Sequence, residues 1–331
     1  MSKDEYERLI LEKHKEKLYF DSQICKEATF KYIDKDKVKR FLEKARFERR
    51  LEANPNMTVK EALEKLNLIK NSDLTNAAVL LFGKNSPRLF LQAETRCARF
   101  KGTKPLEFID MKIFAEDIIS QREDAIEFVK EHIKLHAEIK GTERVERWEY
   151  PIEAIREAIT NAICHRDYKS TANVQIRIFD DRIEIWNPGK LLDGLTVEKL
   201  KEKHESIPRS PLLARNFFLI KYIEQWGTGT NRMVEWCQNY DLPEPVFEEV
   251  GESFVVTIRK YKITEEIMAE LSEEEKAIMN YLKTEKNINR KKGIQLLGVS
   301  KSTLLRIFKS LEEKELIKKC GKGKNIYYIL V

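Results

Sequence analysis

Three polar side chains of different chemistry follow one another at four-residue intervals, namely Glu157, Asn161 and His165. A helix places residues with this spacing along one ridge. A carboxylate can activate water as a general base, and an amide oxygen can ligate Mg²⁺ while the ion keeps water and phosphate oxygens. Alone, such a ridge is typical of a solvated helix face. Its meaning depends on the residues that come after it in the chain.

Two glycine-containing turns come after that ridge. Asn187-Pro188-Gly189 is the first, and Gly227-Thr228-Gly229-Thr230 lies about forty residues later, directly before a helix-like segment. Backbone amides at the start of a helix can hold phosphate. Each turn alone is ordinary, but the order of ridge, first turn and second turn is more specific and indicates a nucleotide site.

Hydrophobic periodicity predicts the elements that would position these residues. Apolar residues repeat at helical spacing along the stretch that begins at Ile152, so this helix would pack on a sheet. Two strands are expected at 173–179 and 182–186, and further strands at 243–261. Pro151 suits a first helical turn and marks a boundary near residue 148.

The first 145 residues predict accessory elements. We expect a helical segment over 1–55 and an accessory α/β region over 56–145. Its expected elements are a helix from Thr58 to Leu68, a strand at 76–83, a strand at 94–100 and a helix over 116–136. His132 and His136 would then be a surface pair on that last helix, because the glutamate of an HExxH zinc site is missing between them.

Charge and composition narrow the class of protein. The 331 residues carry a net charge of +6, but residues 271–331 contain fourteen basic and seven acidic side chains, a net of +7. A basic tail on a near-neutral body indicates a polyanion-binding module. No apolar run approaches the roughly 18 residues of a membrane span. The five cysteines lie more than sixty residues apart, which favours a reducing cytoplasm over a disulfide framework.

The basic tail has the order of a winged helix-turn-helix: helix, helix, turn, helix and a two-stranded wing. Ser272 and Glu275 form a capping box, a second helix covers 289–297, and Ser300 caps the third. One side of the third helix is cationic and hydroxyl-bearing, which suits recognition of double-stranded DNA. The candidate DNA-binding residues are Lys301, Ser302, Thr303, Arg306 and Lys309, with Lys322 and Lys324 at the wing tip.

At this point the chain resembles a known family. Glu157-x-x-x-Asn161, Asn187-Pro188-Gly189 and Gly227-Thr228-Gly229 resemble the N, G1 and G2 boxes of the GHKL ATPases, which share the Bergerat ATP-binding fold. The closer likeness is to the transcriptional regulators labelled RecG-related ATP-dependent helicases, through EAITNAICHRDY, IEIWNPGKL, IPRSPLLA and YIEQWGTGTNRM. The resemblance covers roughly residues 15–260. Fuller members begin with a Schlafen/AlbA-like domain, and this chain starts near the point where that domain ends.

The resemblance implies roles for particular residues. Glu157 would be the water-activating base and Asn161 the Mg²⁺ ligand. Asn187 and Gly189 would lie at the adenine of ATP, and Gly227, Thr228 and Gly229 would border its phosphates. His165 and Arg209 would also contact the nucleotide, with residues 190–210 as a lid.

The sequence departs from the GHKL pattern at three places. The aspartate that reads adenine is Asn187 here, which accepts a hydrogen bond without a full charge. The second glycine box has only two glycines. The threonine expected on a late strand aligns with Glu252. These differences bear on ATP affinity and leave the expected fold unchanged.

The sequence thus predicts an α/β (α+β) chain with a Bergerat-type sandwich at 146–262 and a winged helix-turn-helix at 268–331. We expect a cytoplasmic DNA-binding regulator that binds ATP with Mg²⁺ and is a possible ATPase and homodimer. A translocating helicase would need the P-loop GxxxxGK[ST], which does not occur. A histidine kinase and a nucleotide-free DNA-binding scaffold are two further interpretations of the same sequence.

Overall fold

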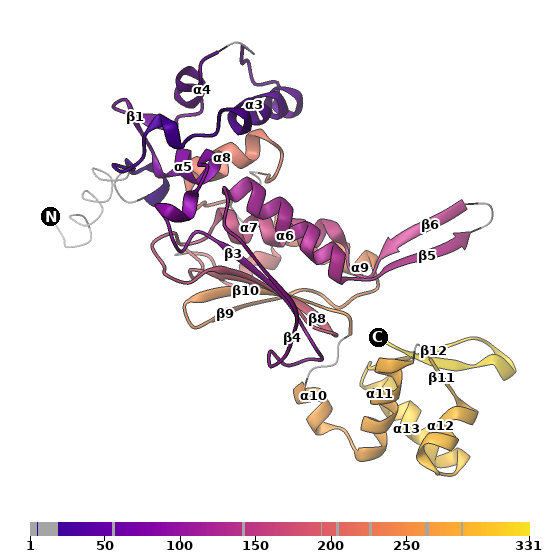
Figure 1. Cartoon of the computed structure of the whole chain (residues 1–331). Coiled ribbons are helices and arrows are strands. Elements are labelled where there is room, and N and C mark those ends of the chain that lie inside the picture. Colours follow the sequence, from indigo (N-terminus) through magenta and orange to yellow (C-terminus); the bar gives the residue numbers. More distant parts are fainter. Residues whose placement is uncertain are drawn as a thin grey trace. The chain divides into compact units, whose positions relative to one another are not determined.

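The computed structural model describes residues 5, 19–54, 57–140, 143–192, 194–202, 205–224, 227–261, 265–285 and 287–331 (Figure 1). Contacts divide the chain into two compact units. The larger comprises residues 1–236 and 245–258, and the smaller comprises 237–244 and 259–331. Among the described helices, none combines the length and the apolar character that a membrane crossing requires.

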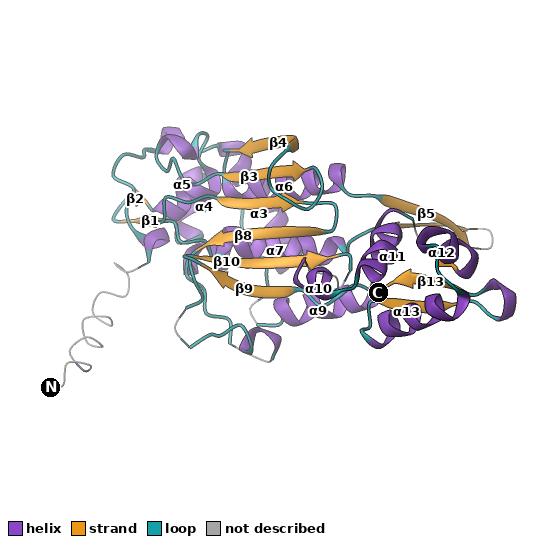
Figure 2. Cartoon of the chain, turned by 90° about the horizontal axis from the view of Figure 1, so that it is seen from below, coloured by secondary structure: helices purple, strands orange, loops and turns teal. Residues whose placement is uncertain are grey.

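A mixed six-stranded sheet is the frame of the larger unit, in the order β4-β3-β7-β8-β10-β9 (Figure 2). This confirms the predicted α/β (α+β) fold class. β3 runs parallel to β7, whereas β3–β4, β7–β8 and β9–β10 are antiparallel. The strands are β3 Thr95–Phe100, β4 Phe108–Phe114, β7 Val174–Ile178, β8 Arg182–Pro188, β9 Val246–Val250 and β10 Ser253–Arg259.

Helices α6 (Ile118–His132) and α7 (Ile152–Cys164) pack against the sheet, and Figure 2 shows them behind its strands. The predicted inward face of α7 is confirmed, because Ile155, Ala158 and Ile159 are fully buried. A buried hydrogen bond from Thr95 Oγ1 to Gln121 Oε1, 2.9 Å long, fixes α6 to β3. The helix that carries Glu157 is therefore held by apolar packing on a rigid sheet.

Strands on both sides of the expected boundary near residue 145 belong to the same sheet, because β3 hydrogen-bonds β7 directly. Between them lies an antiparallel hairpin that periodicity did not predict, β5 Leu135–Lys140 and β6 Glu143–Trp148. The helix expected over 116–136 ends at His132 instead. His132 and His136 are consequently not a helical pair, since His136 lies in β5.

The expected strand at 76–83 is wrong, because residues Asn76–Phe82 form helix α5. Thr75 caps this helix by accepting a hydrogen bond from the Ala78 amide, and every residue of α5 is buried. A segment buried on all sides is apolar throughout, so a short run of this kind has no period that separates helix from strand.

The remaining elements of the larger unit lie before β3 and beside the site. The capping box at Thr58 is present at the start of α4. Residues 30–49 contain one longer helix, which agrees in part with the helical segment expected over 1–55. The first eighteen residues of that segment lie almost entirely outside the described ranges. These elements are α3 Lys35–Arg49, α4 Val59–Lys65, β1 Ile69–Lys70, β2 Asp73–Leu74, α8 Pro211–Leu219 and α9 Gly229–Asn239, with short 3-10 turns at Phe20–Ser22, Phe30–Tyr32, Ser86–Arg88 and Lys199–Lys201.

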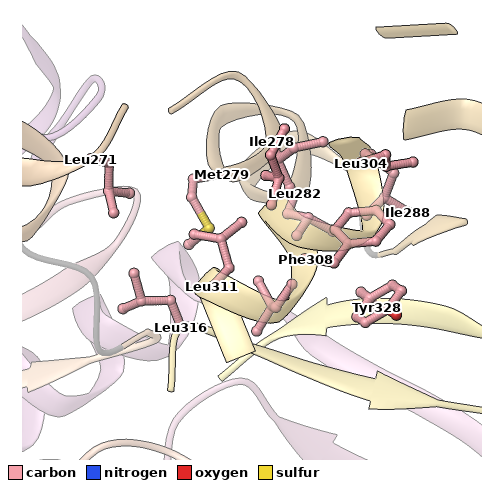
Figure 3. Close-up of a cluster of buried hydrophobic side chains, with 12 residues drawn as sticks. Leu271, Ile278, Met279, Leu282, Ile288, Leu304, Phe308, Leu311, Leu316 and Tyr328 are labelled. Atoms are coloured by element: carbon pink, nitrogen blue, oxygen red, sulfur yellow. The ribbon is translucent and has the colours of Figure 1, made fainter. Parts of the chain in front are cut away.

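The smaller unit packs four helices around a three-stranded antiparallel sheet of order β11-β13-β12. The strand β11 was missed, because two residues are too few to show alternation. Figure 3 shows the core, in which Ile278, Leu304, Phe308 and Leu311 meet. The elements are α10 Glu265–Glu270, α11 Glu273–Thr284, β11 Ile288–Asn289, α12 Arg290–Leu297, α13 Lys301–Glu313, β12 Ile317–Cys320 and β13 Tyr327–Leu330.

Candidate functional site

A cavity of about 450 Å³ opens in the larger unit, between α7, α8, the start of α9 and the end of β8. Its size lies within the range of small-molecule sites. Eight of the nine nucleotide-site residues predicted from the sequence line it, and Thr228 does not. The eight are Glu157, Asn161, His165, Asn187, Gly189, Arg209, Gly227 and Gly229.

Glu157 and Asn161 lie one helical turn apart on α7 and face the cavity together. Asn161 Nδ2 donates to Glu157 Oε1 over 3.0 Å. Burial raises the pKa of Glu157 above its ordinary value, against the opposing effects of that hydrogen bond and of Arg232 and Arg122. Because the amide nitrogen is used on Glu157, the amide oxygen is the atom of Asn161 that can serve as a metal ligand.

The second glycine turn lies directly against this pair. A Cβ atom built on Gly229, the first residue of α9, would lie 1.9 Å from Glu157 Oε1. No larger residue fits there without displacing the carboxylate or the helix. The sequence pattern places a glycine at this point, and the structure gives the reason in the close approach of α9 to Glu157.

Asn187 joins the end of β8 to α7. The side chain is buried, and its amide group is satisfied when Nδ2 donates to the Ala162 carbonyl over 3.1 Å. In that orientation Oδ1 is left to accept a hydrogen bond. Two residues later Gly189 has a φ of 114°. A side chain there would be strained and would lie 3.0 Å from Asp167 Cβ and 3.3 Å from Arg209 Cζ.

His165 and Arg209 lie at the same end of the cavity. The Arg209 guanidinium donates to the Lys190 carbonyl, which fixes it beside Gly189. Burial, together with the charge of Arg209, lowers the pKa of His165 to about 4. The imidazole is therefore neutral near pH 7 and can contact a ligand only as a neutral donor or acceptor.

The loop after β8, which belongs to the segment 190–210 expected as a lid, supplies an apolar wall to the cavity. Its cavity-lining residues are Leu191, Leu192, Leu195, Leu200, Ile207 and Pro208. Thr230 Oγ1 donates to the Leu200 carbonyl over 2.6 Å, and Asn231 Nδ2 donates to the Glu202 carbonyl over 3.2 Å. The loop is thus tied to the first turn of α9.

Two contributors to the site carry no motif and were missed. Arg215 lines the cavity from α8. Asp21, fully buried and far away in sequence, accepts hydrogen bonds from the amides of Leu212 and Leu213 at the start of α8, 2.7 and 3.2 Å long. Asp21 thereby caps α8 from outside. The helical spacing of residues 211–219 was the sequence pattern from which the position of Arg215 could have been predicted. No local sequence pattern predicts the contact of Asp21 with α8.

In the smaller unit, the predicted division of α13 into two sides is largely confirmed. Leu304, Ile307, Phe308 and Leu311 are buried, and Lys301, Ser302, Arg306 and Lys309 are exposed, with Thr303 partly exposed. Ser310 donates to Glu275 over 2.7 Å, so it joins α13 to α11 instead of facing solvent. Leu305 is 37% exposed, so the outer side of α13 also carries a bulky apolar group.

The close packing of α12 on α13 depends on Gly293. A Cβ there would lie 2.9 Å from both methyl groups of Leu304. Beyond α13, Lys322 is exposed in the turn between β12 and β13, and the side chain of Lys324 lies outside the described atoms. The exposed cations of α13 and of this turn are thus carried by elements that a shared core fixes (Figure 3).

Comparisons with known proteins concern parts of this architecture. Residues 171–258 match the family described as "Putative ATP-dependent DNA helicase recG C-terminal", and residues 8–92 match a domain of unknown function, DUF8451. No curated protein matches the chain. Among solved structures, the DIP2311 protein from Corynebacterium diphtheriae has a similar fold, with a TM-score of 0.60 and 18% sequence identity. The alignment covers 96% of this chain and 64% of that protein, so this chain spans less than two thirds of its length.

The matched segment 171–258 contains β7, β8, both glycine turns and β10, and it begins just after the helix that carries Glu157 and Asn161. Four cavity-lining motif residues therefore lie within it, namely Asn187, Gly189, Gly227 and Gly229. The chain carries an ATPase-like domain of the RecG C-terminal type.

Proposed function

We propose that the larger unit binds ATP with Mg²⁺ in the manner of a GHKL ATPase and that the chain is a DNA-binding regulator. The observation that carries the nucleotide half is the convergence of three separate motifs on one cavity. Glu157 and Asn161, Asn187 and Gly189, and Gly229 come from three elements and face the same space. In this proposal residues 146–262 are the nucleotide-binding part of the chain.

Each motif has an atom suited to one part of the ligand. Asn187 Oδ1 can accept from an adenine amino group, because Nδ2 is occupied by Ala162. Asn161 Oδ1 would ligate Mg²⁺ with phosphate and water oxygens as the other ligands. Mg²⁺, when bound, would neutralise phosphate charge. The backbone at Gly227 and Gly229 would face the phosphates. The Arg209 guanidinium, held beside Gly189, would lie at the adenine end of the nucleotide.

In this proposal Glu157 is the general base. Burial raises its pKa, which gives a stronger base than an exposed glutamate, and Asn161 holds one of its oxygens in position. Hydrolysis would need a water molecule within hydrogen-bond reach of that carboxylate. An ATPase activity lost in Glu157→Ala with ATP binding retained is the expected outcome.

The smaller unit has the order of elements that a winged helix-turn-helix requires, and we propose residues 268–331 as a module for double-stranded DNA. The support is the packed α12–α13 pair with Lys301, Arg306 and Lys309 exposed on α13. Lys322 would add a phosphate contact from the turn between β12 and β13. Ser302 and Thr303 lie at the start of α13 and would contact the DNA beside these cations.

Nucleotide binding and the loop 190–210 are connected through α9. The loop is hydrogen-bonded to Thr230 and Asn231, and α9 begins with the glycine that touches Glu157. A nucleotide that fills the cavity would therefore order the loop and α9 together. This is the route by which ATP would regulate the chain.

Titration of ATP-Mg²⁺ into the wild type, Asn161→Ala and Asn280→Ala tests the nucleotide half. Asn280 is exposed on α11 and serves as the matched control. Wild type and control should bind equally, and Asn161→Ala should lose the Mg²⁺-dependent part of the affinity. Absence of binding by wild type would contradict the proposal.

A second candidate function comes from the description of the matched family, which names a helicase. Translocating helicases cradle phosphates in a P-loop, and no GxxxxGK[ST] string occurs in this sequence. Strand separation by the purified chain with ATP would favour the helicase. Equal DNA binding and no ATPase activity in both wild type and Glu157→Ala would favour a nucleotide-free scaffold.

A further inference from the structure

The strand β4 forms one edge of the six-stranded sheet (Figure 2). It exposes a row of apolar side chains. Ile109, Met111 and Ile113 alternate along it and are 59, 53 and 48% exposed. An open edge with apolar side chains is a template for pairing with another strand, and proteins ordinarily cover or charge such an edge. The chemistry of β4 itself indicates which strand would pair with it.

The sequence of β4, Phe-Ile-Asp-Met-Lys-Ile-Phe, is self-complementary about its central residue Met111. In an antiparallel pair of two copies centred on that residue, Met111 lies opposite Met111, and Ile109 lies opposite Ile113. Asp110 lies opposite Lys112, twice by symmetry. Apolar side chains thus meet apolar ones on one face, and opposite charges meet on the other.

The backbone around Met111 is consistent with this register, whereas Ile109 lies at a register shift of the β3–β4 pair between Arg99 and Phe100. Met111 N–H donates to the Asp110 carboxylate over 2.8 Å, as expected for an amide that points away from β3. Alternate residues of an edge strand direct both backbone polar groups outward. Two copies of Met111 can exchange a pair of backbone hydrogen bonds across the twofold axis once each Met111 amide releases the Asp110 carboxylate, which then faces Lys112 of the other copy.

Asp110 and Lys112 already contact other side chains of their own chain, but each can bind a further partner. Lys112 contacts Glu131 over 2.9 Å, and both side chains are exposed. Asp110 contacts His132 over 3.2 Å, and the Asp110 side chain is 38% exposed whereas His132 is largely buried. A lysine has three donors and a carboxylate several acceptor positions, so each can take a second partner across the interface.

The opposite edge of the sheet has no such complementarity. β9 exposes Glu248 and Glu249 side by side and contains no basic residue. Antiparallel pairing of two β9 strands about Glu248 would place the Glu248 carboxylates opposite each other. Only β4, of the two edges of this sheet, is complementary to a copy of itself.

We propose that two copies of this chain associate through β4, antiparallel and centred on Met111, so that one sheet runs through both larger units. The pairing is isologous and closes as a dimer, because each copy offers the single β4 edge to the other. It does not depend on nucleotide or DNA binding. Its consequence for the proposed function is that two DNA-binding modules would be held in one particle.

Substitutions that reverse the charges of Asp110 and Lys112 test the interface. Sedimentation of the full chain measures the self-association of each variant. Asp110→Lys places two lysines opposite each other at both symmetric positions, and Lys112→Asp does the same with aspartates. Each single variant should weaken self-association about tenfold or more. The double variant D110K/K112D restores opposite charges and should dimerise like wild type. Glu248→Lys on β9 is the matched control and should leave the dimer intact.

Mixing the two single variants gives a second readout that a folding defect cannot imitate. In a mixed pair, every lysine lies opposite an aspartate, so the two weakly associating proteins should form a heterodimer. A wild type that stays monomeric at its highest soluble concentration overturns the proposal. So does a dimer that the single variants leave unchanged, because its interface then lies elsewhere or involves the smaller unit.

Discussion

Gly229 and Glu157, far apart in sequence, are in such close contact that a methyl group on Gly229 would lie 1.9 Å from the Glu157 carboxylate oxygen. The φ angle of Gly229 is outside the left-handed region, so the backbone itself would accept another residue. The glycine is required by proximity alone. The contact joins α9, which ties down the loop 190–210, to the helix that carries the proposed base.

Gly229→Ala should therefore destabilise the larger unit by about 1–3 kcal/mol, the usual cost of forcing extra atoms into a packed site. The same substitution in a Glu157→Ala background should cost much less, because the clashing carboxylate is absent. Denaturant unfolding of the four proteins measures this coupling. An equal cost in both backgrounds would show that the contact is not what requires glycine.

Glu157→Gln should change how stability depends on pH. Burial raises the pKa of Glu157 in the folded chain, so the ionised carboxylate destabilises the fold. The wild type should lose stability relative to Glu157→Gln as pH rises from the unfolded value near 4.5 through the raised folded value. Unfolding free energies measured from about pH 4 to about pH 8 give the difference. A difference that shrinks as pH rises would contradict this prediction.

The parts of the site that the sequence predicted are those encoded in local spacing. Glu157 and Asn161 share a helix face because they are four residues apart, and glycines mark the places where backbone and side chain come close. The adjacency of Gly229 to Glu157 could be expected only through the resemblance, since no local pattern relates α7 to α9. The cap that Asp21 provides to α8 was out of reach for the same reason.

The errors in the fold have a common physical origin. The segment 76–82 is buried on every side, so every position after Asn76 is apolar and the sequence shows no period that would separate helix from strand. The pairing of β3 with β7 depends on contacts across some eighty residues, which periodicity does not report. In the smaller unit most elements are amphipathic and capped, and the helices expected after Ser272, over 289–297 and after Ser300 are present.

Asn187→Asp is the substitution that restores the usual GHKL residue, and it should nonetheless be harmful. Nδ2 of Asn187 donates to the Ala162 carbonyl at 3.1 Å, and a carboxylate would place two acceptors together in a buried position. A buried acceptor without a donor costs about 1–3 kcal/mol. Thermal unfolding without nucleotide should show the loss. A variant as stable as wild type would show that the hydrogen bond from Asn187 to the Ala162 carbonyl contributes little to stability.

Arg306→Ala and Lys309→Ala should weaken DNA binding and reduce its salt dependence. Each phosphate contact removed lowers the slope of log K against log salt by about 0.9. Lys283→Ala, an exposed lysine on α11, is the control with the same charge change. Fluorescence anisotropy at several salt concentrations measures both quantities. Equal slopes for all variants would place the DNA contact on another surface.

The smaller unit should lose stability in acid through Glu275. Its carboxylate accepts from Lys314, from Ser310 and from the Ser272 amide. Burial opposes ionisation, but these hydrogen bonds outweigh it, and the pKa of Glu275 lies below its ordinary value of 4.5. Stability from this group is thus present above the unfolded pKa and is lost as pH falls through the folded value.

Glu275→Gln should therefore destabilise the unit by about 1–3 kcal/mol near neutral pH and have little effect in strong acid, where the wild-type carboxyl is protonated. Hydrogen exchange of the α11 and α13 amides at the two pH values reports the change in the smaller unit itself. Glu273→Gln is the matched control, because the Glu273 carboxylate is 87% exposed and pairs only with its neighbour Lys276 at the surface. If Glu275→Gln lowers stability equally at both pH values, Glu275 stabilises the unit by packing, because only the ionised carboxylate is stabilised by the charge of Lys314.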